Sequence, residues 1–207
     1  MQTSMRLATL ITQAGTERKF ASKRTILRQG DEPTHVVLLR YGQVKVKIIR
    51  PEGAVLLAAV RRPVETLGAL GVITGALRTA TVITMSPCTA TVLSAARFRE
   101  LLTKNRLEAE VYQQTTSRFI EAEQWRIEQA TLPARAQLIH ALLRLSFAGP
   151  SGRSTLDLTQ LELSQSIGRD LSVISAALRE LRESGLITTA HGLVTIRDAA
   201  SLRKLVQ

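Results

Sequence analysis

Residues 156–196 constrain this chain more than any other stretch, because their pattern predicts two short helices, a tight turn and a small hairpin. Thr159 and Glu162 have the spacing of a capping box, which starts a helix, and Gly168 suits the turn that follows. A second helix is expected over about residues 170–184. Its apolar residues recur at helical spacing, on a face that must pack against a core; they are Val173, Ile174, Ala177, Leu178 and Leu181.

The opposite face of this second helix carries small residues and one long cation, namely Ser172, Ser175, Ala176 and Arg179. Small residues let a helix approach another surface closely, and an arginine can reach a base edge or a phosphate. Residues 186–188 and 193–196 read as short strands, with His191 and Gly192 as the turn between them. The two helices alone fit an ordinary helical hairpin equally well. The added turn and strands favour a winged helix-turn-helix, whose second helix enters the DNA major groove.

Composition excludes several classes of protein. The chain of 207 residues has no apolar run of 18 residues and no leader-like start, so we expect a soluble cytoplasmic protein without membrane contact. Cys88 is the single cysteine, which rules out a disulfide framework and a cysteine-ligated cluster. Three scattered histidines and no clustered carboxylates predict neither catalytic residues nor metal ligands, and therefore no enzyme.

The net charge of +11 is unevenly distributed along the chain. Residues 1–104 hold 16 lysines and arginines against 6 acidic residues. Such an excess suggests a polyanionic partner, with Lys45 and Lys47 as candidates for contacts to flanking DNA. A well-solvated surface explains the same excess, and both interpretations stay open.

Residues 16–94 read as many short strands separated by turns, the pattern of a β-barrel or sandwich. The strands expected are 25–27, 35–41, 43–49, 55–60, 80–85 and 89–93. Ser94 then caps a short helix that contains Phe98, Leu101 and Leu102.

A long polar helix is expected between Arg106 and Leu132, at about 40 Å for roughly 27 residues. Its apolar members are Leu107, Val111, Phe119, Ile120, Trp125 and Ile127. One small domain cannot cover such a length, so part of the helix is expected to pack on a partner subunit; a spacer between domains is the alternative. Pro133 can begin a further helix as its first residue, ahead of a loop at 149–152.

Residues 67–82 form a glycine-rich stretch that contains Arg78 and Thr79 just before an expected strand. Glycines allow close backbone approach, and a guanidinium beside a hydroxyl could hold a phosphate. Structural turns of this composition are more common than anion sites, so the motif is weak on its own.

Together these features resemble the Crp/Fnr family. The motifs that carry the resemblance are residues 26–31 (ILRQGD), 42–46 (GQVKV) and 178–187 (LRELRESGLI). The resemblance implies an α+β fold in three parts: a cyclic-nucleotide-binding-type β-barrel (a double-stranded β-helix or jelly roll) over 1–104, a long dimerisation helix over 105–132, and a winged helix-turn-helix DNA-binding domain over 133–207. It further implies a homodimeric transcription regulator whose partners are double-stranded DNA and RNA polymerase. The alternative function is a ligand-binding module that gates a protein partner.

The resemblance also implies effector-binding residues, which here are Gly68, Ala69, Arg78, Thr79 and Arg118. Ala69 stands where cyclic AMP binders have a glutamate for the ribose, and Ala122 with Glu123 stand where they have a Thr-Ser pair for the base. We therefore expect weak or absent cyclic AMP binding. No cofactor is predicted beyond a nucleotide or another anionic effector.

The DNA-binding residues predicted from the pattern and the resemblance are Thr159, Gln160, Arg169, Ser172, Ser175, Ala176 and Arg179. Cyclic AMP receptor protein uses Arg, Glu and Arg where this chain has Leu171, Ser172 and Ala176, so a different operator is expected.

Overall fold

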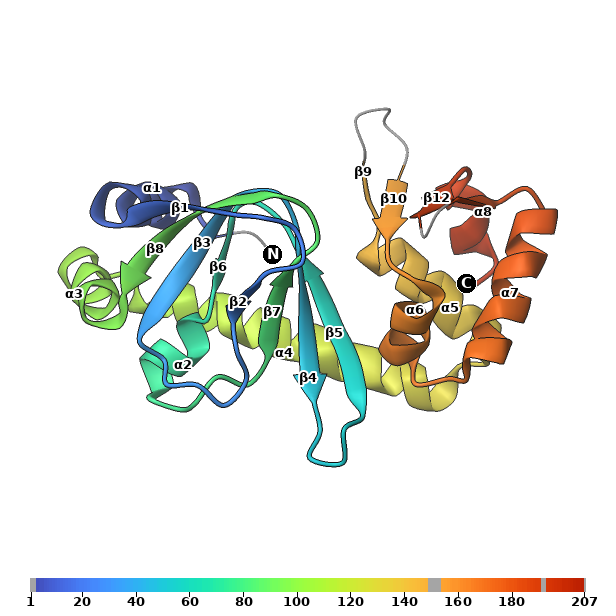
Figure 1. The fold of residues 1–207 in the computed structure, drawn as a ribbon, viewed down its shortest axis with the longest axis horizontal. Coiled ribbons are helices and arrows are strands. Elements are labelled where there is room, and N and C mark those ends of the chain that lie inside the picture. The colour runs from blue at the N-terminus through green and yellow to red at the C-terminus, as the bar shows by residue number, and fades with distance from the viewer. Residues whose placement is uncertain (1–2, 149–153, 191–192, 207) are drawn as a thin grey trace. The chain divides into compact units, whose positions relative to one another are not determined.

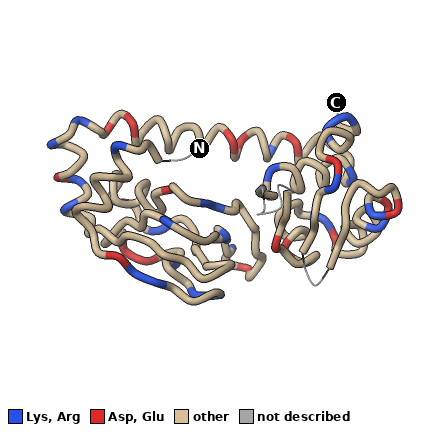
Figure 2. The backbone as a smooth tube through the Cα atoms, turned by 90° about the horizontal axis from the view of Figure 1, so that it is seen from above, with Lys and Arg blue, Asp and Glu red and all other residues tan. Residues whose placement is uncertain are grey.

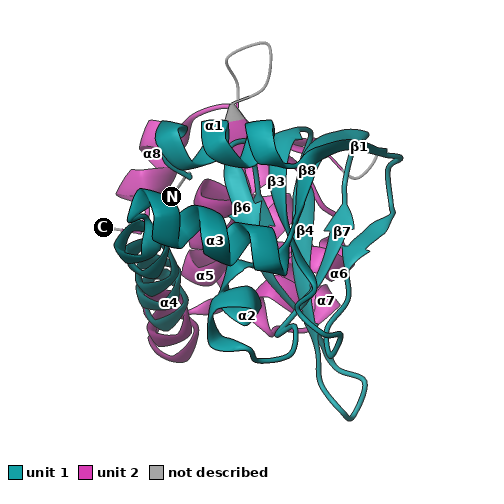
Figure 3. Cartoon of the chain, turned by 90° about the vertical axis from the view of Figure 1, so that its left-hand side faces the viewer, with its two compact units in different colours: residues 1–123 teal, residues 124–207 magenta. Residues whose placement is uncertain are grey.

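The computed structural model describes residues 3–148, 154–190 and 193–206 (Figure 1). The chain divides into two compact units, residues 1–123 and 124–207 (Figure 3). The boundary falls inside the long helix α4 (Glu108–Thr131), which therefore contributes to both units. The turns predicted at 149–152 and at 191–192 lie outside the described residues.

The first unit contains two four-stranded antiparallel sheets, in the orders β1-β8-β3-β6 and β2-β7-β4-β5. The strands are β1 (Thr16–Phe20), β2 (Thr25–Leu27), β3 (His35–Tyr41), β4 (Val44–Ile49), β5 (Val55–Arg61), β6 (Glu65–Leu67), β7 (Thr81–Thr84) and β8 (Cys88–Ser94). Helices α1 (Met5–Ala14), α2 (Ala69–Thr74) and α3 (Ala95–Asn105) complete the unit, together with the first part of α4. The predicted barrel or sandwich is confirmed, and β1, β6, α1 and α2 are additions to the strands and helices predicted.

Strand β3 explains how this unit builds two cores. Its run Val36-Val37-Leu38-Leu39 is apolar throughout, which is typical of a strand buried on both faces. Val37 and Leu39 belong to the core shared with β2, β4 and β7, whereas Val36 and Leu38 pack in the core that includes Phe98 of α3 and residues of α1. Ser94 accepts a hydrogen bond from the Arg97 amide, so the predicted cap of α3 is also confirmed.

The glycine-rich stretch is a helix over part of its length, where the sequence indicated an open turn. Residues 69–74 form α2, and Gly68 and Gly75 flank it with φ of 77° and 73°. Ala69 and Val72 are buried in the same core as Phe98, which favours a packed helical turn. Left-handed backbone at both ends explains why glycines bracket it.

Helix α4 is confirmed as a long helix of 24 residues, or about 36 Å. Val111 and Gln114 are buried. Figure 2 shows both acidic and basic residues along it. Its exposed large hydrophobic residues are Tyr112, Phe119, Ile120 and Ile127.

The second unit consists of the end of α4 and a helical domain with a four-stranded sheet of order β11-β12-β10-β9. Its elements are α5 (Ala134–Leu145), β9 (Phe147–Ala148), β10 (Ser154–Asp157), α6 (Gln160–Ile167), α7 (Leu171–Glu183), β11 (Ile187–Ala190), β12 (Leu193–Ile196) and α8 (Ala199–Lys204). Pro133 is the N-cap of α5 and not its first residue. The predicted helix-turn-helix and the paired strands of the wing are present.

The prediction that Val173 belongs to the buried apolar face of α7 is wrong. Ile174, Ala177, Leu178 and Leu181 are buried, but Val173 is 38% exposed. At about 100° per residue, Val173 lies roughly 90° from the centre of the buried face, in the first turn of the helix. It therefore belongs to the flank of α7.

Candidate nucleic-acid interface and barrel cavity

Local sequence determines how α6 and α7 meet. The Glu162 amide donates to Thr159 Oγ1 (3.1 Å) and the Thr159 amide donates to Glu162 Oε2 (3.3 Å), the complete capping box that starts α6. Gly168 ends the helix with φ of 69°, which an L side chain rarely adopts. The chain can then turn within three residues and start α7 at Leu171.

The predicted reading face of α7 lies opposite its buried face. Ser172 and Arg179 are exposed, and Ser175 and Ala176 are half-buried. Ser175 Oγ lies 2.7 Å from Gln160 Oε1 and 2.8 Å from the Leu171 carbonyl oxygen, so a side chain of α7 is tied to the first residue of α6. The structure therefore brings Gln160 and Ser175 together.

The two arginines predicted to contact DNA are both exposed. Arg179 makes no hydrogen bond or ion pair within the described part of the chain. Arg169, in the turn between α6 and α7, donates from Nε to Gln137 Oε1 at 3.0 Å. Both guanidinium groups therefore keep their terminal nitrogens available to a ligand.

Two apolar residues at the start of α7 were not among the predicted contacts. Leu171 and Val173 are exposed next to Ser172. An exposed apolar side chain on a reading helix can contact the methyl group of thymine. Leu171 could have been predicted as a DNA contact, because its position matches a base-contacting residue of cyclic AMP receptor protein.

The first unit contains a cavity of about 640 Å³ between the β2-β7-β4-β5 sheet, α2 and the first part of α4. All five predicted effector residues line this cavity: Gly68, Ala69, Arg78, Thr79 and Arg118. Its volume is typical of a small-molecule site. Leu27, Val46 and Val82 line its sheet side, and Thr115, Thr116 and Phe119 line its α4 side.

Arg78 is held by the protein itself. Its side chain is buried, Nη1 donates to the Gly68 carbonyl oxygen (2.7 Å), and Nη2 donates to the carbonyl oxygen of His35. A Cβ added at Gly68 would collide with Nη1, so the glycine makes room for the guanidinium. Burial lowers the pKa of Arg78, and the charge of Asp31 opposes this shift. The guanidinium thus braces two backbone segments at the cavity wall.

Arg118 is also engaged within the unit. Nη2 lies 3.0 Å from Glu65 Oε2, and Nη1 donates to the Thr66 carbonyl oxygen at 3.2 Å. Arg61 lies 3.7 Å from the same Glu65 carboxylate and 4.0 Å from the carboxylate of Glu121. Burial lowers the pKa of Arg118, repulsion from Arg61 adds to the shift, and Glu65 opposes it. This network attaches α4 to β6.

Comparison with known families matches both units separately. The family described as the cyclic nucleotide-binding domain matches residues 17–105, and the Crp-like helix-turn-helix domain matches residues 136–205. The two matches occur in the order found in Crp/Fnr transcription regulators. The chain belongs to the Crp/Fnr family. No curated protein sequence matches it.

Solved structures of Crp/Fnr regulators share the fold over almost the whole chain. The c-di-GMP-responsive global regulator CLP of Xanthomonas campestris is 16% identical with a TM-score of 0.76, covering 94% of this chain and 100% of its own. FixK2 of Bradyrhizobium japonicum is 15% identical with a TM-score of 0.77, covering 93% and 98%. A CRP-family transcriptional regulator of Thermus thermophilus is 21% identical with a TM-score of 0.71, covering 91% and 96%. At these identities the likeness shows the fold.

The cavity of this Crp/Fnr chain is lined mostly by apolar residues. Ala69 is buried at the start of α2 and offers only a methyl group. The residues that line the cavity include three arginines (Arg61, Arg78 and Arg118) and no carboxylate. Each of these arginines already has an acceptor in the protein. An anionic ligand therefore competes with existing contacts.

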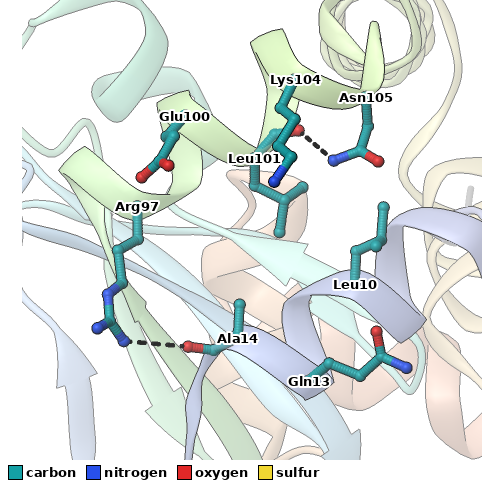
Figure 4. Close-up of a pocket in the computed structure, with 8 residues that line it drawn as sticks. All are labelled: Leu10, Gln13, Ala14, Arg97, Glu100, Leu101, Lys104 and Asn105. Carbon is teal, nitrogen blue, oxygen red and sulfur yellow. Dashed lines mark hydrogen bonds between the residues drawn. The ribbon is translucent and has the colours of Figure 1, made fainter.

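A second hollow, of about 620 Å³, lies between α1 and α3 (Figure 4). Leu10 and Leu101 line it together with the charged residues Arg97, Glu100 and Lys104. Arg97 Nη1 donates to the Ala14 carbonyl oxygen at 3.5 Å, which links the two helices. The hollow thus combines apolar side chains with charges of both signs.

Neither a metal centre nor a membrane span was found in the part of the chain that the structure describes. No group of three or more His, Cys, Asp or Glu side chains there could hold a metal ion. No described helix combines the length and the apolar character needed to cross a bilayer.

Proposed function

We propose that this Crp/Fnr regulator acts as a homodimer that binds duplex DNA at a specific, roughly palindromic sequence, with α7 in the major groove. The observation that carries the proposal is the exposed face of α7. Its small residues permit close approach, and Arg179 has no partner within the described residues. Regulation of transcription is then achieved by DNA binding and not by catalysis.

Each predicted DNA-binding residue has a role in this proposal. Arg179 and Ser172 contact base edges or nearby phosphates, and Ala176 lets the helix approach the groove. Ser175 is aligned by Gln160, whose amide is left to reach a phosphate together with Thr159 at the start of α6. Arg169 contacts a phosphate from the turn. Leu171 and Val173 add apolar contacts to thymine methyl groups.

The proposed dimer forms through α4. Tyr112, Phe119, Ile120 and Ile127 are exposed on this helix, with Phe119 64% exposed. Residues 112, 119, 120 and 127 recur at intervals of seven and eight, which places them along one side of a helix. Residues 105–132 would then be the dimerisation segment between a sensing part (1–104) and a DNA-binding part (133–207).

The proposed sensing part binds a small effector in the 640 Å³ cavity, against Gly68, Ala69, Arg78, Thr79 and Arg118. A nucleotide or another anion must share Arg78 and Arg118 with their protein partners. Ala69 removes a hydrogen-bonding carboxylate, a loss of about 1–3 kcal/mol, so cyclic AMP should bind weakly or not at all.

RNA polymerase is the further partner we propose, in the cytoplasm. The hollow between α1 and α3 supports this proposal, because it offers Arg97 and Lys104 beside apolar side chains on the surface of the barrel. Mixed apolar and charged surfaces of this kind suit protein partners.

Selection from a pool of random duplexes tests the DNA-binding proposal. The full chain should enrich a palindromic sequence whose half-sites are about 34 Å apart, and sedimentation should give a dimer. Phe119→Glu together with Ile120→Glu should yield a monomer with much weaker binding, whereas Gln13→Glu, at an exposed position of α1, should not. A monomer that enriches no sequence would refute the proposal.

A further inference from the structure

The end of α4 lacks one of the backbone hydrogen-bond donors that a continuing helix would supply. In a continuous helix the amide of residue 133 would donate to the carbonyl oxygen of Gln129, but residue 133 is proline and has no N–H. Gln137 supplies the missing donor. Its Nε2 lies 2.7 Å from the Gln129 carbonyl oxygen and 2.8 Å from that of Leu132, so a side chain of α5 caps the end of α4.

The oxygen of the same side-chain amide binds Arg169, which we propose contacts a phosphate. Gln137 Oε1 accepts from Arg169 Nε at 3.0 Å. The side chain of Gln137 is only 1% exposed, and both its donor and its acceptor atoms are used. A flipped amide would face its oxygen toward two carbonyl oxygens and its NH₂ toward a guanidinium, so the network permits one orientation only.

This arrangement leaves Arg169 with a defined pose. The bond to Gln137 occupies Nε, and the terminal nitrogens make no hydrogen bond within the described residues. Those two nitrogens form the edge of the guanidinium that can bind two phosphate oxygens at once. A long exposed side chain otherwise loses much conformational entropy on binding, and one fixed bond reduces that loss.

A second bond links the same turn of α4 to the helix-turn-helix. Gln129 Nε2 donates to the carbonyl oxygen of Ser166, near the end of α6. The last turn of α4 is therefore bonded both to the end of α6 and, through Gln137, to the turn that follows it.

We propose that Gln137 is a positioning residue for DNA binding, which holds Arg169 ready for a phosphate and makes that pose depend on the last turn of α4. The inference rests on the proposed DNA-binding function. It adds a route by which a change in the end of α4 alters DNA affinity. If that turn unwinds, the carbonyl oxygens of Gln129 and Leu132 move away, and the amide that orients Arg169 is released.

Salt-dependent binding of the full chain to a random-sequence 40-base-pair duplex tests the proposal. Arg169→Ala should lower the slope of log K against log [salt] by roughly 0.9 for each phosphate that the variant no longer neutralises. Gln137→Leu should lower the slope in the same direction and weaken binding about three- to tenfold, the value of about one hydrogen bond. Combined with Arg169→Ala, Gln137→Leu should change affinity less than about 1.5-fold, because both residues act on the same phosphate.

The matched control is Gln124→Leu, the same change at an exposed position of α4, which should leave slope and affinity unchanged. A purely structural Gln137 would lower the melting temperature of the Leu variant without changing the slope, and that result overturns the proposal. If Gln137→Leu does not fold, Gln137→Met, which is closer to glutamine in shape, replaces it. Its uncharged side chain gives Arg169 Nε no carboxamide acceptor, so the slope should again fall, and an unchanged slope again overturns the proposal. If the unaltered chain binds neither this duplex nor a selected one, the proposed function itself fails.

Discussion

The two units of this protein use the same residue type in opposite ways. In the first unit, Arg78 and Arg118 lie at the cavity wall and donate to carbonyl oxygens or to Glu65. In the second unit, Arg169 and Arg179 are exposed and keep terminal nitrogens without partners among the described residues. All four were predicted from the sequence to bind anions.

The comparison teaches that burial and partners, more than residue type, decide what an arginine does. A buried guanidinium with protein acceptors contributes mainly to stability, because removing either partner leaves a desolvated polar group unpaired. An exposed guanidinium contributes almost nothing to stability and remains available to a phosphate. Substitutions in the first unit should therefore change unfolding, and substitutions in the second should change DNA binding.

The largest effect is expected for Glu65→Ala, which tests the first half of the comparison. Removing this buried carboxylate leaves Arg118 and Arg61 without their shared partner, a loss of about 3 kcal/mol in the free energy of unfolding. Denaturant unfolding measures it. Glu121→Ala is the control, since this more exposed carboxylate lies 4.0 Å from Arg61 and should cost less than about 1 kcal/mol. Equal losses would contradict the difference in burial.

Arg78→Met comes next, with an expected loss of about 2 kcal/mol in the free energy of unfolding. The methionine fills much of the volume but removes the two hydrogen bonds that Arg78 donates to the carbonyl oxygens of Gly68 and His35. Arg24→Met, at an exposed position of the same unit, should change stability by less than about 0.5 kcal/mol. If the Arg78→Met protein is as stable as the parent and has lost only effector binding, Arg78 contacts the effector and does not stabilise the fold.

Arg179→Ala tests the second half of the comparison. DNA affinity should fall about tenfold, or about 1.4 kcal/mol, while unfolding stays within about 0.5 kcal/mol of the parent protein. Titration of the selected duplex and denaturant unfolding supply the two values. A destabilised variant with unaltered DNA affinity would mean that Arg179 stabilises the fold and does not bind DNA.

The smallest effect concerns His35, next to Arg78. Burial lowers the pKa of His35 below its ordinary value of 6.5, and the charge of Arg78 adds to the shift. The unfolded chain therefore binds a proton more readily, and the contribution of His35 to stability is lost as pH falls below about 6.5. His35→Gln should reduce the decline in unfolding free energy between about pH 7.5 and 5.5. An identical decline in both proteins would show that other groups cause it.

Sequence alone predicted the elements whose signals are local. The capping box at Thr159, the turn at Gly168 and the buried face of α7 depend on residues a few positions apart, and the structure confirms them except for Val173. Helix α2 was missed because Gly68 and Gly75 suggest a turn, whereas burial of Val72 in a tertiary core makes the segment helical.

The partners of the predicted site residues could not be found in the same way. Arg78 donates to His35, 43 residues away, and Arg169 donates to Gln137, 32 residues away. Backbone carbonyls carry no sequence signal, and a lone glutamine in a helix has none either. The gathering of the five effector residues around one cavity followed from the family resemblance, whereas the hydrogen bonds that Arg78 and Arg118 already make within the protein did not.

The fit between Gly68 and Arg78 has a consequence for anyone who wishes to retune this regulator as a biosensor. A side chain at 68 collides with the guanidinium and must also adopt a φ of 77°, so the two positions are coupled in sequence space. Libraries that vary position 78 alone would sample mostly unstable proteins, and libraries that vary position 68 alone would sample clashes. New ligand preferences should therefore be sought with both positions varied together, or at Thr79 and Thr116, which line the same cavity and are exposed.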